Sequence, residues 1–168
     1  RLSGTPDVLP ILMPETLLSC TGSKGPLRIR GQLRSFNNRS GVGNKLVLTV
    51  YATDIQPGTG ESCNQILLTG SLCKPPIFRR TPLGRSICDL MLAVNRHYGR
   101  SDYLPCICWG LKAREAAGWT VGTHLQLQGR IQSRSYIKLT EDGPVEKTAF
   151  EVSVTDAAPD APEEDQFS

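Results

Sequence analysis

The chain has 168 residues, of which 39% are hydrophobic and 21% are charged. This composition is typical of a globular protein and excludes a fibrous or low-complexity chain. No apolar run reaches the length of a membrane-spanning helix, and no signal peptide with a basic start and an apolar middle is present, so we expect a cytoplasmic protein.

The net charge of +3 conceals an asymmetry along the chain. Residues 74–136 hold ten Lys or Arg and three acids, a balance of +7, whereas residues 156–168 hold five acids and no base, a balance of −5. The basic body indicates a polyanionic partner, with a solvated charged surface as the alternative. The Pro- and acid-rich end predicts a disordered tail over residues 157–168.

The residues that usually build catalytic or metal sites are sparse. Six cysteines are present without a CxxC pair, and there are only two histidines. Because zinc ligands cluster at short spacings, we expect no metal site, and the cysteines are interpreted as small buried hydrophobes. No Gly-rich phosphate loop or Ser/Cys–His–Asp grouping stands out, so we expect no catalytic residues, no cofactor and no enzyme.

Three segments from the first third of the chain recur later in the same order. The aligned pairs are RLSGTPDVLP (1–10) with RHYGRSDYLP (96–105), LRIRGQLRS (27–35) with LQLQGRIQS (125–133), and LTVYATDI (48–55) with FEVSVTDA (150–157). The offset drifts from 95 to 98 to 102, as small loop insertions would cause. The order indicates an internal duplication, with a partial first copy over residues 1–60 and a complete second copy over residues 64–156.

The second copy opens with residues 64–95, which have no counterpart before Arg1. The first copy therefore lacks its opening two strands. Either the chain is truncated or the first copy is degenerate, and the absence of an initial methionine favours truncation.

The elements of the second copy are predicted in chain order. The apolar run 65–72 predicts a strand, and the prolines and glycine of 75–84 predict a loop. The stretch 86–95 is apolar on nearly both faces, which favours a buried strand. Residues 103–109 predict a third strand, with Tyr103, Pro105, Ile107 and Trp109 on one face.

A short helix and two further strands complete the second copy. Good helix formers over 111–117 end at Gly118, and residues 123–134 alternate as a half-exposed strand should. The last strand is predicted over 148–154. Five strands with a helix between the third and fourth is the layout of an OB-fold barrel. We therefore predict an all-β protein with a five-stranded OB-fold barrel and one short helix, preceded by a partial OB-like repeat.

These segments resemble the bacterial single-stranded DNA-binding proteins over residues 64–156. The resemblance rests on LTGSL (68–72), RTPLG (80–84), LAVN (92–95), CWG (108–110) and LQGRIQSR (127–134). It implies binding of single-stranded DNA without sequence specificity during replication, recombination and repair, at the cytoplasmic nucleoid. A primosome accessory or RNA-binding OB-fold protein is the alternative. Two OB domains per chain resemble the form of this family that assembles four domains as a homodimer.

The resemblance also implies which side chains contact the nucleic acid. Bases would stack on four aromatic rings, Tyr98, Tyr103, Trp109 and Tyr136. Phe78 is a further candidate platform because it lies in the basic loop and not because the resemblance includes it. The candidate phosphate contacts are Arg79, Arg80, Arg85, Arg96, Arg100, Arg130 and Arg134. A basic groove with aromatic platforms holds single strands in this way, and such binding weakens with salt. Tyr103 and Trp109 share a face with Ile107, so either ring could instead belong to the core.

The first copy serves as an internal control. At the positions aligned with the four rings it has Ser3, Val8, Pro14 and Asn38. We interpret the first domain as mainly structural and as a support for dimerisation, although its arginines could still guide a strand. The acidic tail, which carries Phe167, is a candidate site for recruiting replication and repair proteins.

Overall fold

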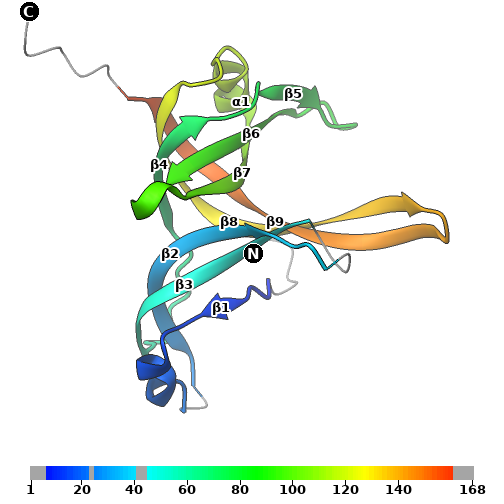
Figure 1. The fold of residues 1–168 in the computed structure, drawn as a ribbon. Coiled ribbons are helices and arrows are strands. Elements are labelled where there is room, and N and C mark those ends of the chain that lie inside the picture. The colour runs from blue at the N-terminus through cyan, green and yellow to red at the C-terminus, as the bar shows by residue number, and fades with distance from the viewer. Residues whose placement is uncertain (1–6, 23–24, 41–44, 161–168) are drawn as a thin grey trace, which may run out of the picture. The chain divides into compact units, whose positions relative to one another are not determined.

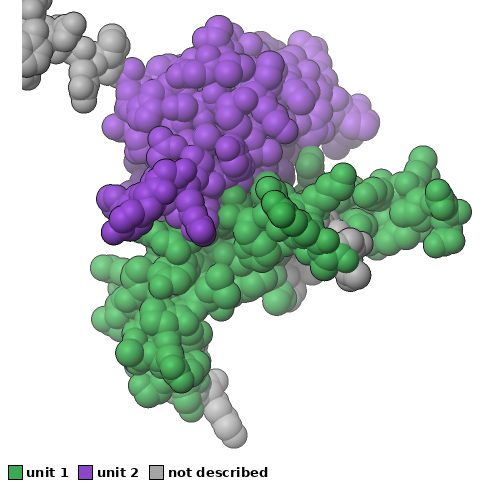
Figure 2. All heavy atoms as spheres, in the orientation of Figure 1, with its two compact units in different colours: residues 1–64, 132–150 green, residues 65–131, 151–168 purple. Residues whose placement is uncertain are grey.

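The computed structural model describes residues 7–22, 25–40 and 45–160. The chain divides into two compact units, each built from two segments (Figure 2). The first unit comprises residues 1–64 and 132–150, and the second comprises residues 65–131 and 151–168. Strands β8 (His124–Thr140) and β9 (Gly143–Pro159) each contribute to both units. Residues 157–159, which were assigned to the predicted tail, belong to β9, and residues 161–168 lie outside the described part of the chain.

The second unit contains the strands and the helix that follow residue 64 (Figure 1). Its own elements are β4 (Ile66–Leu72), β5 (Ile77–Arg80), β6 (Ser86–Asn95), β7 (Ser101–Trp109) and α1 (Gly110–Ala116). The strand order is β4-β8-β9-β7-β6-β5, and β4 also pairs with β6. Strand β7 is parallel to β9, whereas β4 is antiparallel to β8 and β6 to β7. The predicted all-β class is confirmed, and the pairings link five strands in the OB-fold order with the helix between the third and fourth.

The core of this unit follows from strand alternation. Residues two apart on a strand share a face, and the buried face of each strand is apolar. On β7 the buried residues Leu104, Cys106 and Cys108 alternate with a set that is more exposed at Tyr103 but also contains the buried Ile107. The interior is completed by apolar side chains from the neighbouring strands, among them Leu92, Leu125, Leu127 and Val152. Removal of this apolar surface from water is the main force that closes the sheet around its core.

Strand β5 differs from the sequence prediction, which placed a loop over residues 75–84. Residues 77–80 pair with β6 in antiparallel register, from Ile77 opposite Asp89 to Arg80 opposite Ser86. The prolines that indicated a loop all lie outside these four residues. Residues 77–80 can therefore pair with β6 as the edge strand of the sheet. Strand β6 covers the predicted range 86–95, whereas β8 continues six residues past its predicted end at 134.

The first unit contains a smaller sheet of the same kind. Its elements are β1 (Ile11–Leu12), the 3-10 helix η1 (Glu15–Thr21), β2 (Leu27–Asn37) and β3 (Leu46–Pro57). The strand order is β1-β3-β2, with β1 parallel to β3. This matches the order β7-β9-β8 of the second unit, with η1 in the place of α1. The sheet buries Leu48, Ala52 and Ile55.

The duplication extends to the register of the strands. In the first unit Ile11 is opposite Val50, and in the second unit the aligned residues Cys106 and Val152 are opposite each other. Residues that the sequence alignment matches, at offsets of 95 and 102, are therefore paired in the same way in both units.

One glycine in each unit has the same steric role. A Cβ at Gly31 would lie 2.1 Å from the carbonyl oxygen of Tyr51, and a Cβ at Gly129 would lie 2.3 Å from that of Ser153. These distances are far below van der Waals contact, so only glycine permits the close approach of the two strands. The two pairs occupy aligned positions, which makes this contact part of the repeated fold.

The helices are short. Besides η1 and α1 there is a 3-10 turn, η2 (His97–Gly99), between β6 and β7. Among the described residues, no helix has the length and apolar character required to cross a membrane.

Candidate nucleic-acid interface

The outer face of β7 carries two of the predicted rings. Leu104 and Cys108 point to the interior, so Tyr103, Pro105 and Trp109 point outward. The Tyr103 side chain is 45% exposed, and Trp109 is half-buried. Ile107 lies on the same face and is buried, so it is the partial exposure of Trp109, and not the strand alternation, that places its ring at the surface.

Two arginines lie on the same outer face as Trp109. The guanidinium carbon of Arg85 lies 5.0 Å from the centroid of the Trp109 ring, within the range of a cation–π contact. Arg79 is opposite Ile87, which is opposite Trp109, so the three residues form one row across β5, β6 and β7. Arg85 is therefore the cation that lies over the ring, whereas Arg79 lies two strands away with the buried Ile87 between them.

An acidic partner fixes the orientation of Arg79. Its Nε donates a 2.8 Å hydrogen bond to Oδ2 of Asp89, and this bond raises the pKa of the arginine. Both side chains are partly exposed, so the pair contributes little to stability. Its main effect is to hold the guanidinium against the sheet, in the row that contains Trp109.

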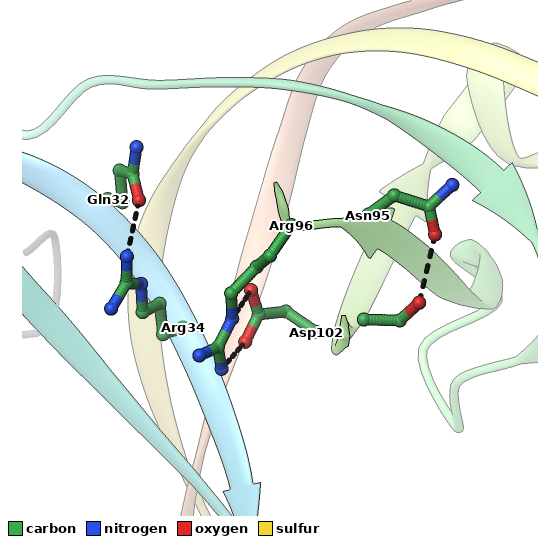
Figure 3. A network of polar contacts seen from close by, with 6 residues as sticks. Gln32, Arg34, Asn95, Arg96 and Asp102 are labelled. Atoms are coloured by element: carbon green, nitrogen blue, oxygen red, sulfur yellow. Dashed lines mark hydrogen bonds and ion pairs between the residues drawn. The ribbon is translucent and has the colours of Figure 1, made fainter. Parts of the chain in front are cut away.

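The loop between β6 and β7 is held by a second ion pair (Figure 3). Arg96 donates through Nε and Nη2 to the two carboxylate oxygens of Asp102, with an Nε–Oδ2 distance of 2.7 Å. Asp102 is only 2% exposed, and its hydrogen bond raises the pKa of Arg96. The backbone N–H of Arg96 also donates to the carbonyl of Arg100, and Ser101 donates to Asn95. These hydrogen bonds stabilise the turn between β6 and β7. Arg100 lies in this turn and is exposed to solvent.

Tyr98 lies at the tip of this turn in an uncommon conformation. Its φ of 71° and ψ of 29° place it in the left-handed region, and its side chain is fully exposed. Asn and Gly adopt this region more readily than a bulky residue, for which the conformation costs on the order of 1–3 kcal/mol. The turn thus presents an aromatic ring to solvent at a position where the backbone favours a smaller residue.

The remaining predicted residues lie elsewhere. Phe78 and Arg80 alternate with Arg79 on β5 and point to its other face, where Phe78 is 40% exposed. Arg130 lies on the part of β8 that belongs to the second unit, whereas Arg134 and Tyr136 belong to the first unit. The structure therefore places Arg79, Arg85, Trp109 and Tyr103 on one face of the sheet, with Arg85 over the Trp109 ring, and groups Arg96, Tyr98 and Arg100 in the turn between β6 and β7.

The sequence prediction missed the acids that orient these arginines. Asp89 was counted only as an opposing charge in a basic segment, whereas Asp102 was also assigned to the set of residues shared by both copies and therefore to the fold, without its arginine partner. A signal was present for Asp102, because the repeat aligns it with Asp7. Asp7 accepts hydrogen bonds from the backbone N–H and the hydroxyl of Ser133 within the first unit. An aspartate that is present in both copies indicated a structural role.

The cysteines do not form a metal site in the described part of the chain. All six are free thiols, and no group of three or more metal-ligating side chains is found there. Cys88 and Cys108 lie opposite each other in the core, and burial raises the pKa of Cys88 to about 11 and that of Cys108 to about 12. Such thiols are unreactive packing groups. Cys63 differs from the interpretation as a buried hydrophobe because it is exposed.

The fold and the outer face define an OB-fold module with a cationic and aromatic surface, which is the usual architecture of single-strand binders. Residues 63–158 match the model of the Single-strand binding protein family. The match covers more than half of the chain, and the chain belongs to this family.

Curated relatives and solved structures agree with this assignment. The chain is 35% identical over 80 residues to Single-stranded DNA-binding protein 2 of Listeria innocua, covering 44% of this chain and 50% of the relative. It is 36% identical over 80 residues to Single-stranded DNA-binding protein B of Bacillus subtilis, covering 44% and 71%. A deletion mutant of the single-stranded DNA binding protein from Thermus aquaticus superposes with a TM-score of 0.65 and 26% identity, covering 82% of this chain and 63% of that one.

The extent of the matches separates the two units. The chain spans about half the length of the first curated relatives that it matches. The structural match covers 82% of this chain, which is more than residues 63–158 can supply. The structural likeness therefore includes part of the first unit, which the family model does not cover.

Proposed function

We propose that the chain binds single-stranded DNA without sequence specificity, as a non-enzymatic protein of replication, recombination and repair. The observation that carries this proposal is the outer face of the second unit, where Arg85 lies over Trp109, Arg79 lies two strands away on the same face, and Tyr103 lies on the same strand as Trp109. Family membership supports the same reading.

The chemistry of this face suits a flexible polyanion. Bases stack on exposed rings, and each stacked base contributes on the order of 1–3 kcal/mol. Arginines beside the rings neutralise phosphates and release counterions, which makes affinity fall as salt rises. The fully exposed Tyr98 and the neighbouring Arg100 extend this surface along the turn that follows β6.

Intrinsic fluorescence titrated with oligo-dT, oligo-rU and duplex DNA at several salt concentrations tests the proposal. We expect the strongest quenching with oligo-dT and a steep loss of affinity with salt. A preference for oligo-rU would transfer the proposal to an RNA-binding OB-fold protein. Absence of binding at low salt would refute both.

Variants locate the binding to the outer face. Tyr103→Leu and Trp109→Leu should each lower the affinity for oligo-dT about tenfold, because each removes one stacking ring. Leu111→Ala is the matched control, since Leu111 is an exposed apolar residue on α1. Unchanged affinity in both ring variants would contradict the assignment of the site.

The assembly and cellular partners extend the same proposal. We propose a homodimer that contains four OB-type units, placed at the cytoplasmic nucleoid, with the acidic end recruiting replication and repair proteins. The two units of equal strand order within one chain support the count of units. Light scattering of the purified chain measures the assembly, and a monomeric mass would contradict it.

A further inference from the structure

Strand β5 forms an edge of the sheet in the second unit. The strand order ends at β5, and within the described residues β5 pairs with β6 alone. An edge strand presents a row of backbone N–H and C=O groups without a neighbouring strand, and this row is a template for pairing with another chain. Several classes of protein bind an extended peptide at such an edge. The free side of β5 is therefore a candidate site for strand addition.

The register identifies the backbone groups on the free side of β5. Thr81 continues the register of the strand, and its N–H donates to the carbonyl of Arg85 on the side of β6. Successive residues of an antiparallel strand direct their N–H and C=O groups alternately to opposite sides. The groups of Arg79 therefore point toward β6, and those of Phe78 and Arg80 point away from it. Together these two residues offer two donors and two acceptors to an added strand.

Apolar side chains flank the free backbone groups on both faces of β5. Ile77 is 62% exposed on one face, and Phe78 is 40% exposed on the other. Leu83, in the turn that follows the strand, is 91% exposed. Edge strands that avoid association usually carry charges or a bulge at such positions. Exposed apolar groups beside an open backbone row are instead typical of a surface that packs against a partner.

The charge of this segment selects the chemistry of the partner. Residues 74–85 contain four bases and no acid. Arg79 is paired with Asp89, whereas within the described residues neither Arg80 nor Arg85 takes part in an ion pair. Opposite charges across a strand pair are stabilising, and like charges are destabilising. An added strand that carries Asp or Glu is therefore favoured, and a second copy of this basic segment is disfavoured.

The backbone groups also distinguish a peptide from a nucleic-acid strand. Phosphate oxygens accept hydrogen bonds but donate none, so they can pair with the N–H groups of Phe78 and Arg80 but not with their carbonyls. An extended peptide supplies both a donor and an acceptor at every second residue, at the spacing of the sheet ladder. The free edge therefore fits a peptide better than a phosphate backbone.

We propose that β5 binds an extended acidic segment of a partner protein as a further strand of the sheet. Main-chain hydrogen bonds to Phe78 and Arg80 supply the affinity, and acidic side chains beside Arg80 supply the selectivity. A ladder of this length buries a small area, so the interaction is weak and transient. The inference goes beyond the proposed function and does not depend on it.

Amide hydrogen exchange in the wild-type chain, followed by NMR, tests the proposal. In the free protein the amide protons of Phe78 and Arg80 should exchange faster than that of Arg79, which points toward β6. The probe is the blocked acidic peptide VEVDVEV, whose alternating valines favour an extended strand. At saturation it should slow exchange at Phe78 and Arg80 about tenfold and leave Arg79 little changed.

Two matched peptides separate strand addition from charge attraction. The same sequence N-methylated at alternate residues keeps its charges but loses the N–H groups along one side, so it should bind about tenfold more weakly. The peptide VKVKVKV keeps the strand pattern and reverses the charge, so it should not bind. Equal binding of VEVDVEV and its N-methylated form would overturn the proposal, because attraction between charges needs no ladder.

A pair of protein variants tests the basic side of the edge. Arg80→Gln should lower the affinity for VEVDVEV about threefold, because it removes a cation beside the added strand. Lys138→Gln is the matched control, since Lys138 is an exposed base on β8 in the first unit. It should bind the peptide like wild type. Equal losses in both variants would show that the peptide responds only to net charge, against the proposal.

Other occupants of the edge give different results. Slower exchange at Phe78 and Arg80 with oligo-dT, but not with VEVDVEV, would assign the edge to nucleic acid and overturn the proposal. Protection that appears without peptide and grows with protein concentration would assign it to a second copy. Peptide protection in a chain that does not bind oligo-dT would support this inference and overturn the proposed function. Oligo-dT binding without peptide protection would do the reverse.

Discussion

The two units have the same strand order and the same close glycine contact, yet each has a different Arg–ring pair. In the second unit Arg85 covers Trp109, a residue of β7. In the first unit Arg34 covers Tyr51, a residue of β3. Arg34 and Tyr51 align with Gln132 and Ser153, and Trp109 aligns with Pro14, whereas Arg85 has no counterpart in the partial first copy. The backbone constraints of the duplicated fold are therefore shared, whereas the outward side chains differ.

The difference has a physical origin in what each position requires. Gly31 and Gly129 tolerate no Cβ because a carbonyl oxygen occupies its place. An outward side chain on a strand meets only solvent and its neighbours, so many residue types fit there. A stacking surface can consequently be built at several places on one sheet, and its location has to be read from the structure of each unit.

The largest effect is expected at the shared glycines. Gly31→Ala and Gly129→Ala should each lower the free energy of unfolding by about 3 kcal/mol, because the strand must move away from a carbonyl oxygen. Urea denaturation of the full chain measures the loss. Gly25→Ala is the control, since a Cβ at Gly25 has no neighbour within 4 Å. Equal stability of all three variants would show that the contact is not shared by the two units.

A smaller loss is expected at the turn of the second unit. Arg96→Gln should cost about 2 kcal/mol in unfolding free energy, because it removes the two charge-assisted hydrogen bonds that Arg96 donates to the buried carboxylate of Asp102. Arg79→Gln should cost less than about 1 kcal/mol, because the Arg79–Asp89 pair is partly exposed.

Salt titrations distinguish an arginine that stabilises the turn, Arg96, from one that contacts phosphate, Arg100. Arg100→Gln should reduce the slope of log affinity against log salt by about one, whereas Arg96→Gln should leave the slope unchanged. The reverse pattern would assign the phosphate contact to Arg96.

Tyr98 should show opposite effects on stability and binding. Tyr98→Asn places a residue that favours the left-handed region at φ 71°, so we expect stability to rise by up to about 1 kcal/mol. The same change removes an exposed ring and should weaken oligo-dT binding about fivefold. Thermal unfolding and fluorescence titration measure the two effects. A variant that gained stability and bound like wild type would remove Tyr98 from the interface.

The reactivity of the native thiols compares the two units without any substitution. At pH 8 an aromatic disulfide reagent should react at once with exposed Cys63 of the first unit, but with Cys88 and Cys108 of the second unit only after unfolding. Burial keeps these two thiols protonated until the pH approaches about 11 and about 12. Because their folded pKa lies above the unfolded value, their contribution to stability is complete below about pH 9 and is lost as the pH rises toward 11. Rapid labelling of Cys88 in folded protein would contradict its burial.

Much of the fold could be predicted from the sequence because the pattern of apolar residues and the positions of glycine and proline were clear. The apolar stretch 86–95 gave the exact range of β6, and the helix formers before Gly118 gave α1 within a residue. Strand β5 was missed because its four residues lie between prolines. Its pairing depends on the neighbouring edge of β6, which no local pattern reports.

The candidate site was predictable only in part. Tyr103 and Trp109 lay on one predicted face, but the same face contains buried Ile107, so periodicity could not separate surface from core. The pairing of Arg79 with Asp89 depends on the register between β5 and β6. The stacking of Arg34 on Tyr51 depends on the register between β2 and β3, and the alignment of the two copies does not report that register.

The path of β8 and β9 decides how this chain can be dissected. Because residues 132–150 of the two strands belong to the first unit, no single cut separates the units. A fragment starting near residue 64 would retain this hairpin and lose the partners that residues 1–64 provide. The two units are therefore best compared by point substitutions in the intact chain.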